Sequence, residues 1–503
     1  MTEANQGTPH QMVGLQRASD GSDGRDGPDQ LARLMELADT SGMMLFHSTR
    51  KQSYAMVPVG EGSRVLAVTS DEVGDWLGQR FYATYGVPPS AHALDVAVRA
   101  LSGKARFGGE ERDLFLRLGS RENSHVVEVD LGDEVGRAVQ ITASGWTVVP
   151  SATLMFRRPS AMAALPTPAP GGSLELLRPF VNASHDHFQR LVGFLVACCR
   201  PSGPYPILEI TGPQGASKTT LARVIRALID PSLATARSAP SNDRDLAIAA
   251  HNAYLLSFDN MSQISPQMSD ALCRISTGGG WSGRALYHDA KEMVLEYSRP
   301  MVLNGIISLA RRPDLLERTI PIELQPIKVR RSEDELWRDF GAVRPLILGA
   351  LYDAVACSLS RRHLPEPTGL PRLADSAVWV HNAEPSLGWP PGTFINLMTE
   401  VRRNAARRAL HEYDGLLAAL ICLVDSAHSA GGKEWKGTMS DLLTYLVKTE
   451  VGGLPNAPSG LGDLMRRLVP ALAEEGIDVT FDRNRNTRFV LIGYRQLATE
   501  GVD

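Results

Sequence analysis

The sequence has little of three features that often reveal the class of a protein: cysteine, charge of one sign and long apolar runs. Only five cysteines occur in 503 residues, and Cys198 and Cys199 alone are neighbours. They give neither a disulfide framework nor the paired spacing of a zinc site. Because 52 basic residues nearly balance 56 acidic ones, net charge does not indicate a nucleic-acid partner. Any such partner must be inferred from particular segments.

Apolar runs are short as well. The two longest, 191–199 and 415–424, reach only about half of the roughly 18 to 20 residues that a membrane-spanning helix needs. We therefore expect buried helices and no membrane partner. The first residues, MTEANQGTPH, contain neither the basic nor the apolar segment of a secretory signal, so we expect a cytoplasmic protein.

Composition divides the first third of the chain into three parts. Residues 1–30 are rich in Gly, Asp and Ser with few aliphatic residues, which predicts a disordered arm. Residues 31–158 alternate short strand-like runs with helix-like stretches, which predicts an α+β domain. Pro, Ala and Gly dominate residues 159–173, so we expect a linker there and a domain boundary near residue 165.

The remaining two thirds begin with residues 174–330, where apolar strand-like runs alternate with helix-like segments, as is typical of an α/β core. Residues 331–430 suggest consecutive amphipathic helices, the first with an N-cap at Ser332. Residues 436–498 show two helix-like segments and two strand-like ones, the order of a winged helix. The predicted fold class is a multidomain α/β and α+β protein with an α/β core, a helical subdomain, an N-terminal α+β domain and a C-terminal winged helix.

The most informative segment is LEITGPQGASKTTLARVI, residues 208–225. An apolar strand enters a glycine-containing loop, and an amphipathic helix begins where that loop ends. Backbone amides of such a loop and the positive end of the helix can bind a triphosphate, with Lys218 on the β and γ phosphates and Thr219 on Mg²⁺. The residues expected to bind ATP are Gly212, Pro213, Gln214, Gly215, Ala216, Ser217, Lys218, Thr219 and Thr220.

Two departures from common P-loop patterns accompany this segment. Ser217 occupies the second glycine position of G-x-x-x-x-G-K-[ST], and a small residue fits there only if the backbone is not of the glycine-only kind. The strand-like run YLLSF ends at Asp259, which we expect to bind Mg²⁺ through water, although a simple turn residue is the alternative. Asn260 follows where many ATPases have a glutamate, and an amide cannot act as a general base.

A third strand-like run, PMVL, ends at Asn304, which can contact the γ phosphate or orient water. Arg318 precedes the next strand, where an arginine can reach the nucleotide of a neighbouring subunit. The alternative is a solvated arginine paired with Asp314 or Glu317. We therefore predict that catalysis depends on Lys218, Asp259, Asn304 and Arg318, with Thr219 and Asp259 as metal ligands.

Four ordered segments, GPQGASKT, YLLSFDN, LCRISTGGGWSGRALYHDAKEMV and RPMVLNG, resemble superfamily 3 helicases, compact AAA+ relatives of phages, plasmids and DNA viruses that include poxvirus-type primase-helicases. The resemblance implies a homo-oligomeric ring, such as a hexamer, with ATP and Mg²⁺ at subunit interfaces. It implies ATP hydrolysis coupled to DNA translocation or unwinding in replication. It also implies that Arg284 and Lys291 face a DNA strand in the channel. More loosely, the whole chain is similar to ATP-binding proteins of bacterial prophages and integrated elements.

Arginines in the C-terminal part offer a second candidate DNA surface. We expect Arg466 and Arg467 on a recognition helix, and Arg483, Arg485 and Arg488 on the hairpin, to contact phosphates. Ordinary solubilising charge is the alternative, because several acids lie close by.

Two further functions stay open. Ser217 and Asn260 favour a nucleotide-gated DNA-binding or replication-initiation scaffold that hydrolyses ATP slowly. Asp130, Asp133 and His47 are residue types that a primase uses around metal, which would make the chain a bifunctional primase-helicase. Turn acids and an ordinary half-buried histidine are the favoured interpretation of these three residues.

Overall fold

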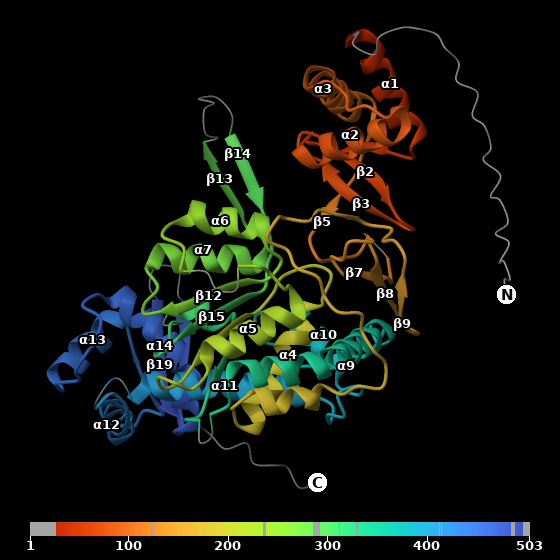
Figure 1. Ribbon diagram of the computed structural model, residues 1–503. Helices are drawn as coiled ribbons and strands as arrows, with labels where there is room; N and C mark the ends of the chain where they lie inside the picture. Colours follow the sequence, from red (N-terminus) through yellow and green to blue (C-terminus); the bar gives the residue numbers. More distant parts are fainter. Residues whose placement is uncertain are drawn as a thin grey trace, which may run out of the picture. The chain divides into compact units, whose positions relative to one another are not determined.

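The computed structural model describes residues 27–121, 124–234, 238–284, 292–310, 312–327, 330–411, 413, 415–483 and 488–495. The chain divides into two compact units, Met1–Leu114 and Phe115–Asp503 (Figure 1). All but the last few residues of the predicted disordered arm lie outside the described residues, and α1 begins at Gly27.

The first unit packs three helices with a four-stranded sheet of order β3-β2-β1-β4. Leu34, Phe81 and Leu101, one from each helix, are almost fully buried in the core. Helix α2 ends at Gly86, whose left-handed φ of 72° closes the last turn. The elements are α1 (Gly27–Thr40), β1 (Met44–His47), β2 (Ser53–Val59), β3 (Gly62–Ala67), α2 (Asp71–Tyr85), α3 (Ala91–Gly108) and β4 (Glu110–Glu111).

The second unit begins with an antiparallel sheet that the sequence division placed in the N-terminal domain. Val139 and Ile141 of this sheet share a core with Leu348 and Leu351 of α9, and for that reason the division of the chain falls after Leu114 instead of near residue 165. The sheet consists of β6 (Leu118–Gly119), β7 (Val127–Asp130), β8 (Ala138–Thr142) and β9 (Gly145–Val149). Strand β5 (Leu114–Phe115), at the division between the units, pairs with β10 (Met155–Phe156) in a separate two-stranded sheet.

Residues 159–173, expected to be a linker, pack along the second unit. The amide of Ala163 donates to Pro231 O at 2.9 Å, and that of Ala169 donates to Pro345 O at 2.9 Å. A Cβ atom on Gly172 would lie 2.0 Å from Leu346 O, so the backbones touch there. The segment is therefore packed against the second unit and is not a free linker, and its glycine allows the close approach of the two backbones.

A parallel sheet of order β12-β15-β11-β16 forms the centre of the second unit (Figure 1). Side chains alternate between its faces: Leu208 packs with α4 and α5, whereas Ile207 packs with α6 and α7. Helices thus cover both faces, which explains the apolar strand sequences. The elements are η1 (Leu174–Phe180), α4 (His185–Cys198), β11 (Ile207–Thr211), α5 (Lys218–Ile229), α6 (Asp243–Asn252), β12 (Leu256–Met261), α7 (Pro266–Thr277), β15 (Met301–Gly305), α8 (Pro313–Leu316) and β16 (Thr319–Glu323).

Between α7 and β15 the chain forms an antiparallel hairpin, and after β16 it continues into three helices. Helix α9 is long and apolar enough to cross a membrane by length and composition, with a mean hydropathy of 1.4 over 18 residues, contrary to the expectation from run lengths. However, 56% of that window is buried in the structure, so packing against the sheets accounts for its apolar residues. The elements are β13 (Gly280–Arg284), β14 (Glu292–Glu296), α9 (Glu333–Ser360), α10 (Ala374–Ala383) and α11 (Thr393–His411).

The C-terminal subdomain, residues 415–495, has a core of its own that includes Leu420, Leu468 and Ile492. The expected order of two helices and a hairpin is present. Helix α12 and strand β17 also belong to this subdomain, whereas the sequence predicted α12 as part of the preceding helical subdomain. Helix α11 contributes to both the central core and this one, so it connects them. The elements are α12 (Leu416–Ser429), β17 (Glu434–Gly437), α13 (Met439–Lys448), α14 (Pro458–Glu474), β18 (Ile477–Arg483) and β19 (Arg488–Tyr494).

Candidate functional site

The loop between β11 and α5 has the backbone that a phosphate cradle requires. Gly212 and Gly215 adopt φ values of 143° and 79°, and a Cβ atom on Gly212 would lie 2.7 Å from Leu324 O. Ser217 also has a positive φ of 64°, with ψ of 32°. This left-handed conformation is open to serine, but it costs a residue with a Cβ atom roughly 1 kcal/mol or more. Ser217 is therefore mildly strained where glycine would not be.

Lys218, Thr219 and Asp259 meet at the end of this loop. Lys218 is the first residue of α5, and its Nζ donates to Gly212 O at 2.9 Å and Pro213 O at 2.8 Å. The Thr219 hydroxyl donates to Asp259 Oδ1 at 3.0 Å, although 40 residues separate the two in sequence. Hydroxyl and carboxylate oxygens at this separation can share the coordination shell of Mg²⁺, directly or through water.

Asn304 completes the group from β15, the strand between β11 and β12. It is 1% exposed, and its Oδ1 accepts a hydrogen bond of 2.7 Å from the amide of Asn260. Its Nδ2 is buried and has no hydrogen-bond partner among the described residues. An unpaired buried amide nitrogen costs about 1 to 3 kcal/mol, so this donor indicates a ligand that would accept its hydrogen bond.

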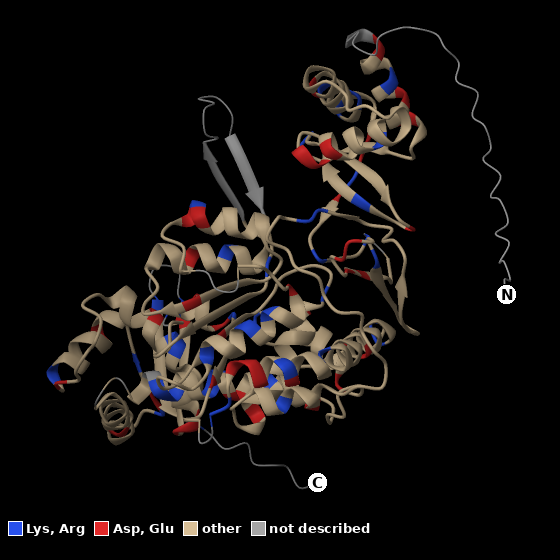
Figure 2. Ribbon diagram, viewed as in Figure 1, with Lys and Arg blue, Asp and Glu red and all other residues tan. Residues whose placement is uncertain are grey.

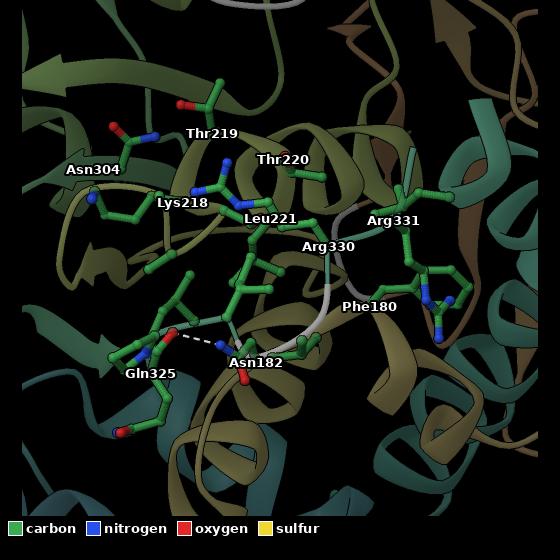
Figure 3. A pocket seen from close by; sticks show the side chains of 18 of the residues that line it. Phe180, Asn182, Lys218, Thr219, Thr220, Leu221, Asn304, Gln325, Arg330 and Arg331 are labelled. Carbon is green, nitrogen blue, oxygen red and sulfur yellow. Dashed lines mark hydrogen bonds between the residues drawn. The ribbon is translucent and has the colours of Figure 1, made fainter. Parts of the chain in front are cut away.

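These residues line a cavity of about 1380 Å³ (Figure 3). Asn182 also lines the cavity, and its Nδ2 donates to Gln325 O at 2.5 Å, while the Gln325 amide donates to Asn182 O at 2.9 Å. The volume is ample for a nucleotide. The glycine cradle, the unpaired Asn304 nitrogen and the Thr219–Asp259 oxygens fit a nucleoside triphosphate with Mg²⁺.

Two features of this site escaped the sequence analysis. Glu209 of β11 is 2% exposed, and its carboxylate accepts hydrogen bonds from the Leu309 amide and from the Ala310 amide at 3.0 Å. It thereby fixes the loop that follows Asn304, and the acid inside the apolar run ILEIT was the available signal. Arg330 also lines the cavity, but nothing in its local sequence indicated that.

Arg318 lies at the amino-terminal end of the parallel strands, opposite the end that carries the glycine loop. Its carbonyl accepts from the Ile207 amide at the start of β11, whereas the glycine loop follows the end of that strand. The Arg318 side chain is 10% exposed, and its Nη1 donates to Asp314 O at 2.5 Å. Within one subunit, Arg318 is thus away from the cavity and paired with Asp314.

The expected DNA-facing hairpin is present as β13 and β14, with Arg284 opposite Glu292. The Arg284 side chain, Lys291 and Arg485 lie outside what the structure describes.

Helix α14 presents a charge-balanced face to solvent. Its exposed residues include Asp463, Arg466 and Glu474. Arg466 donates to Asp463 Oδ1 at 2.9 Å and stacks 4.9 Å over the Phe481 ring, while Glu474 pairs with two arginines of α11. Acidic and basic residues are interspersed over the second unit (Figure 2).

The other C-terminal arginines are divided between helix and hairpin. Arg467 is half-buried, whereas Arg483 and Arg488 face each other, exposed, at the end of the β18–β19 hairpin. The hairpin end is therefore the more accessible cationic part of this subdomain.

The acids considered for a primase are engaged in ion pairs. Asp130 binds Arg158 at 2.5 Å, and Asp133 binds Arg137 at 2.7 Å. His47 is buried, and its Nδ1 lies 3.0 Å from Ser48 O. No group of three or more metal-binding side chains occurs among the described residues. Their contacts therefore account for the two acids as structural residues.

The fold is that of a multidomain α/β protein with a central parallel sheet. Residues 174–387 match the family of actinomycete integrative conjugative element replication proteins, and residues 416–499 match the C-terminal domain of RepA of the same elements. The two matches cover more than half of the chain. The chain belongs to the RepA family of replication proteins of actinomycete integrative conjugative elements.

Solved structures offer more distant likenesses. The apo C-terminal region of NrS-1 is 9% identical, covering 92% of this chain and 98% of that one at a TM-score of 0.40. SCCmec type IV Cch, described as an active helicase, is 11% identical, covering 90% and 93% at a TM-score of 0.43. JCV helicase is 15% identical, covering 44% and 66% at 0.21. Such scores carry no argument about function, and no curated protein is similar to the chain.

Proposed function

We propose that this replication protein is an ATP-binding, DNA-acting ATPase of the superfamily 3 helicase type. In this proposal it works in the cytoplasm as a homo-oligomeric ring, such as a hexamer, with ATP and Mg²⁺ between subunits. Hydrolysis would drive translocation or unwinding of DNA when the integrated element replicates. The C-terminal subdomain would serve as a winged helix that holds DNA.

One observation carries the proposal: residues from three neighbouring parallel strands converge on one cavity. Lys218 and Thr219 follow β11, Asp259 lies on β12, and Asn304 lies on β15. Lys218 supplies positive charge for the phosphates, Thr219 and Asp259 supply metal-binding oxygens, and the Asn304 nitrogen can donate to the terminal phosphate or to water. Arg318 would act on the nucleotide of the next subunit, since it is far from its own.

A slowly hydrolysing, nucleotide-gated scaffold is the second candidate, and the described cavity favours it in one respect. Its lining carboxylates are Asp259 and Glu333. Asp259 accepts from Thr219, and hydrogen bonds from Arg223 and Trp337 hold the pKa of Glu333 below its ordinary value. Both acids are thus engaged in hydrogen bonds, and Asn260 occupies the usual position of the base, which favours slow hydrolysis.

ATP hydrolysis by the full chain, with and without single-stranded DNA, tests the proposal. A motor predicts turnover that DNA stimulates and that Lys218→Ala abolishes. The scaffold predicts ATP-dependent retention of DNA with turnover near background. Unchanged ATP binding in Lys218→Ala would contradict both candidates. Lys104→Ala provides a control for the lysine replacement, because Lys104 is an exposed lysine of the first unit that binds Asp39.

A further inference from the structure

The segment that connects β16 to α9, residues 324–332, runs beside the glycine loop and is fixed at both ends. At its start the Leu324 amide donates to Thr211 O at 2.9 Å. At its end Ser332 caps α9 by accepting from the Glu335 amide at 3.2 Å, and Arg223 of α5 binds Glu333. Residues 328–329 lie outside the described part. The positions of the ends therefore place Arg330 next to the loop.

Arg330 extends over the glycine loop. A Cβ atom built on Gly215 would lie 3.6 Å from Arg330 Nη2, which puts the guanidinium in contact distance of the loop backbone. Figure 3 shows the Arg330 side chain pointing toward Lys218 and Thr219, whereas the side chain of Arg331 points away. Arg331 instead lies 3.9 Å from Asp339 of α9.

Two cations thus converge without a carboxylate between them. Among the described residues, Lys218 binds only loop carbonyls and Arg330 makes no hydrogen bond or ion pair. The cavity carboxylates, Asp259 and Glu333, already have partners. Like charges that face each other in this way repel unless an anion lies between them, and a planar guanidinium matches phosphate oxygens in two-pronged fashion.

We propose that Arg330 binds the terminal phosphate of the nucleoside triphosphate held by its own subunit. This role rests on the proposed nucleotide-binding function and adds to it a preference for the triphosphate over the diphosphate. The backbone amides of the loop serve the inner phosphates, which ATP and ADP share. Arg330 reaches toward Lys218 and Thr219, where the terminal phosphate would lie, so it distinguishes triphosphate from diphosphate.

The test is equilibrium binding of Mg·ATP and Mg·ADP to the full chain and to Arg330→Ala, Arg330→Lys and Arg331→Ala. Arg330→Ala should weaken ATP binding about 10-fold or more, as expected for a hydrogen bond between charged groups, and change ADP binding less than about 2-fold. Arg330→Lys should retain part of the preference for ATP. The matched control Arg331→Ala should bind both nucleotides like the parent.

Two results would overturn this role: unchanged ATP affinity in Arg330→Ala, or equal losses for ATP and ADP. Arg330 is exposed, so its replacement should preserve the thermal unfolding midpoint, and that measurement separates a binding defect from a folding defect. If the parent chain binds neither nucleotide, the proposed function itself fails. If the parent binds ATP and only the Arg330 prediction fails, the proposed function stands without this arginine.

Discussion

The cavity beside β11 and the exposed face of α14 were both chosen from sequence by the kinds of residue they contain, yet the structure treats them differently. At the cavity, Lys218, Asp259 and Asn304 meet although 86 residues separate the first from the last. On α14, the neighbouring Asp463 neutralises Arg466. Polar residues at the ends of parallel strands are placed by the sheet itself. The role of a charge on a helix surface depends on its neighbours.

The largest expected effect that sharpens this comparison comes from Asp259→Asn. If Asp259 holds Mg²⁺ through water, steady-state ATP turnover should fall about 10- to 100-fold, the range for groups that act on a metal from the outer shell. Asp270→Asn is the control, because Asp270 is an exposed acid that pairs with Arg312. Turnover that survives in Asp259→Asn would show that the contact with Thr219 is only structural.

On α14, a smaller effect is expected. Arg466→Ala should change duplex-DNA affinity less than about 2-fold, whereas Arg483→Ala with Arg488→Ala should weaken it several-fold and flatten its salt dependence by about one unit per lost phosphate contact. Fluorescence anisotropy at several salt concentrations measures both. Asp463→Asn, which frees Arg466, should bind DNA more tightly than the parent. A large loss in Arg466→Ala alone would mean that α14 reads DNA directly and would remove the contrast between the two regions.

The smallest effect concerns the loop itself. Ser217→Gly should relieve the left-handed backbone and raise the free energy of unfolding of the second unit by about 1 kcal/mol. Ser217→Ala keeps the Cβ atom and should give no such gain. Chemical denaturation of both variants against the parent measures the difference. Equal stability of the glycine and alanine variants would show that φ at residue 217 does not strain the loop.

The sequence predicted much of the cavity because its signals are local. A strand, a glycine loop and a helix start specify where Lys218 and Thr219 lie, and strand ends specify Asp259 and Asn304. Arg330 and Glu209 depend on how distant segments cross, which no local pattern encodes. The alternating runs of residues 115–158 resembled part of the N-terminal α+β domain, since the partner that covers them, α9, begins only at residue 333. Likewise, α12 joins the C-terminal core through contacts that its own sequence does not reveal.

The central claim is that the cavity between the glycine loop, Asp259 and Asn304 binds a nucleoside triphosphate. A calorimetric titration of the full chain with Mg·ATP, repeated with Lys218→Ala, tests it most directly. The account predicts saturable binding by the parent and a loss of about 10- to 100-fold in the variant, as expected when a charged hydrogen-bond donor to phosphate is removed. Equal binding by the parent and Lys218→Ala, or no binding by the parent, would contradict it.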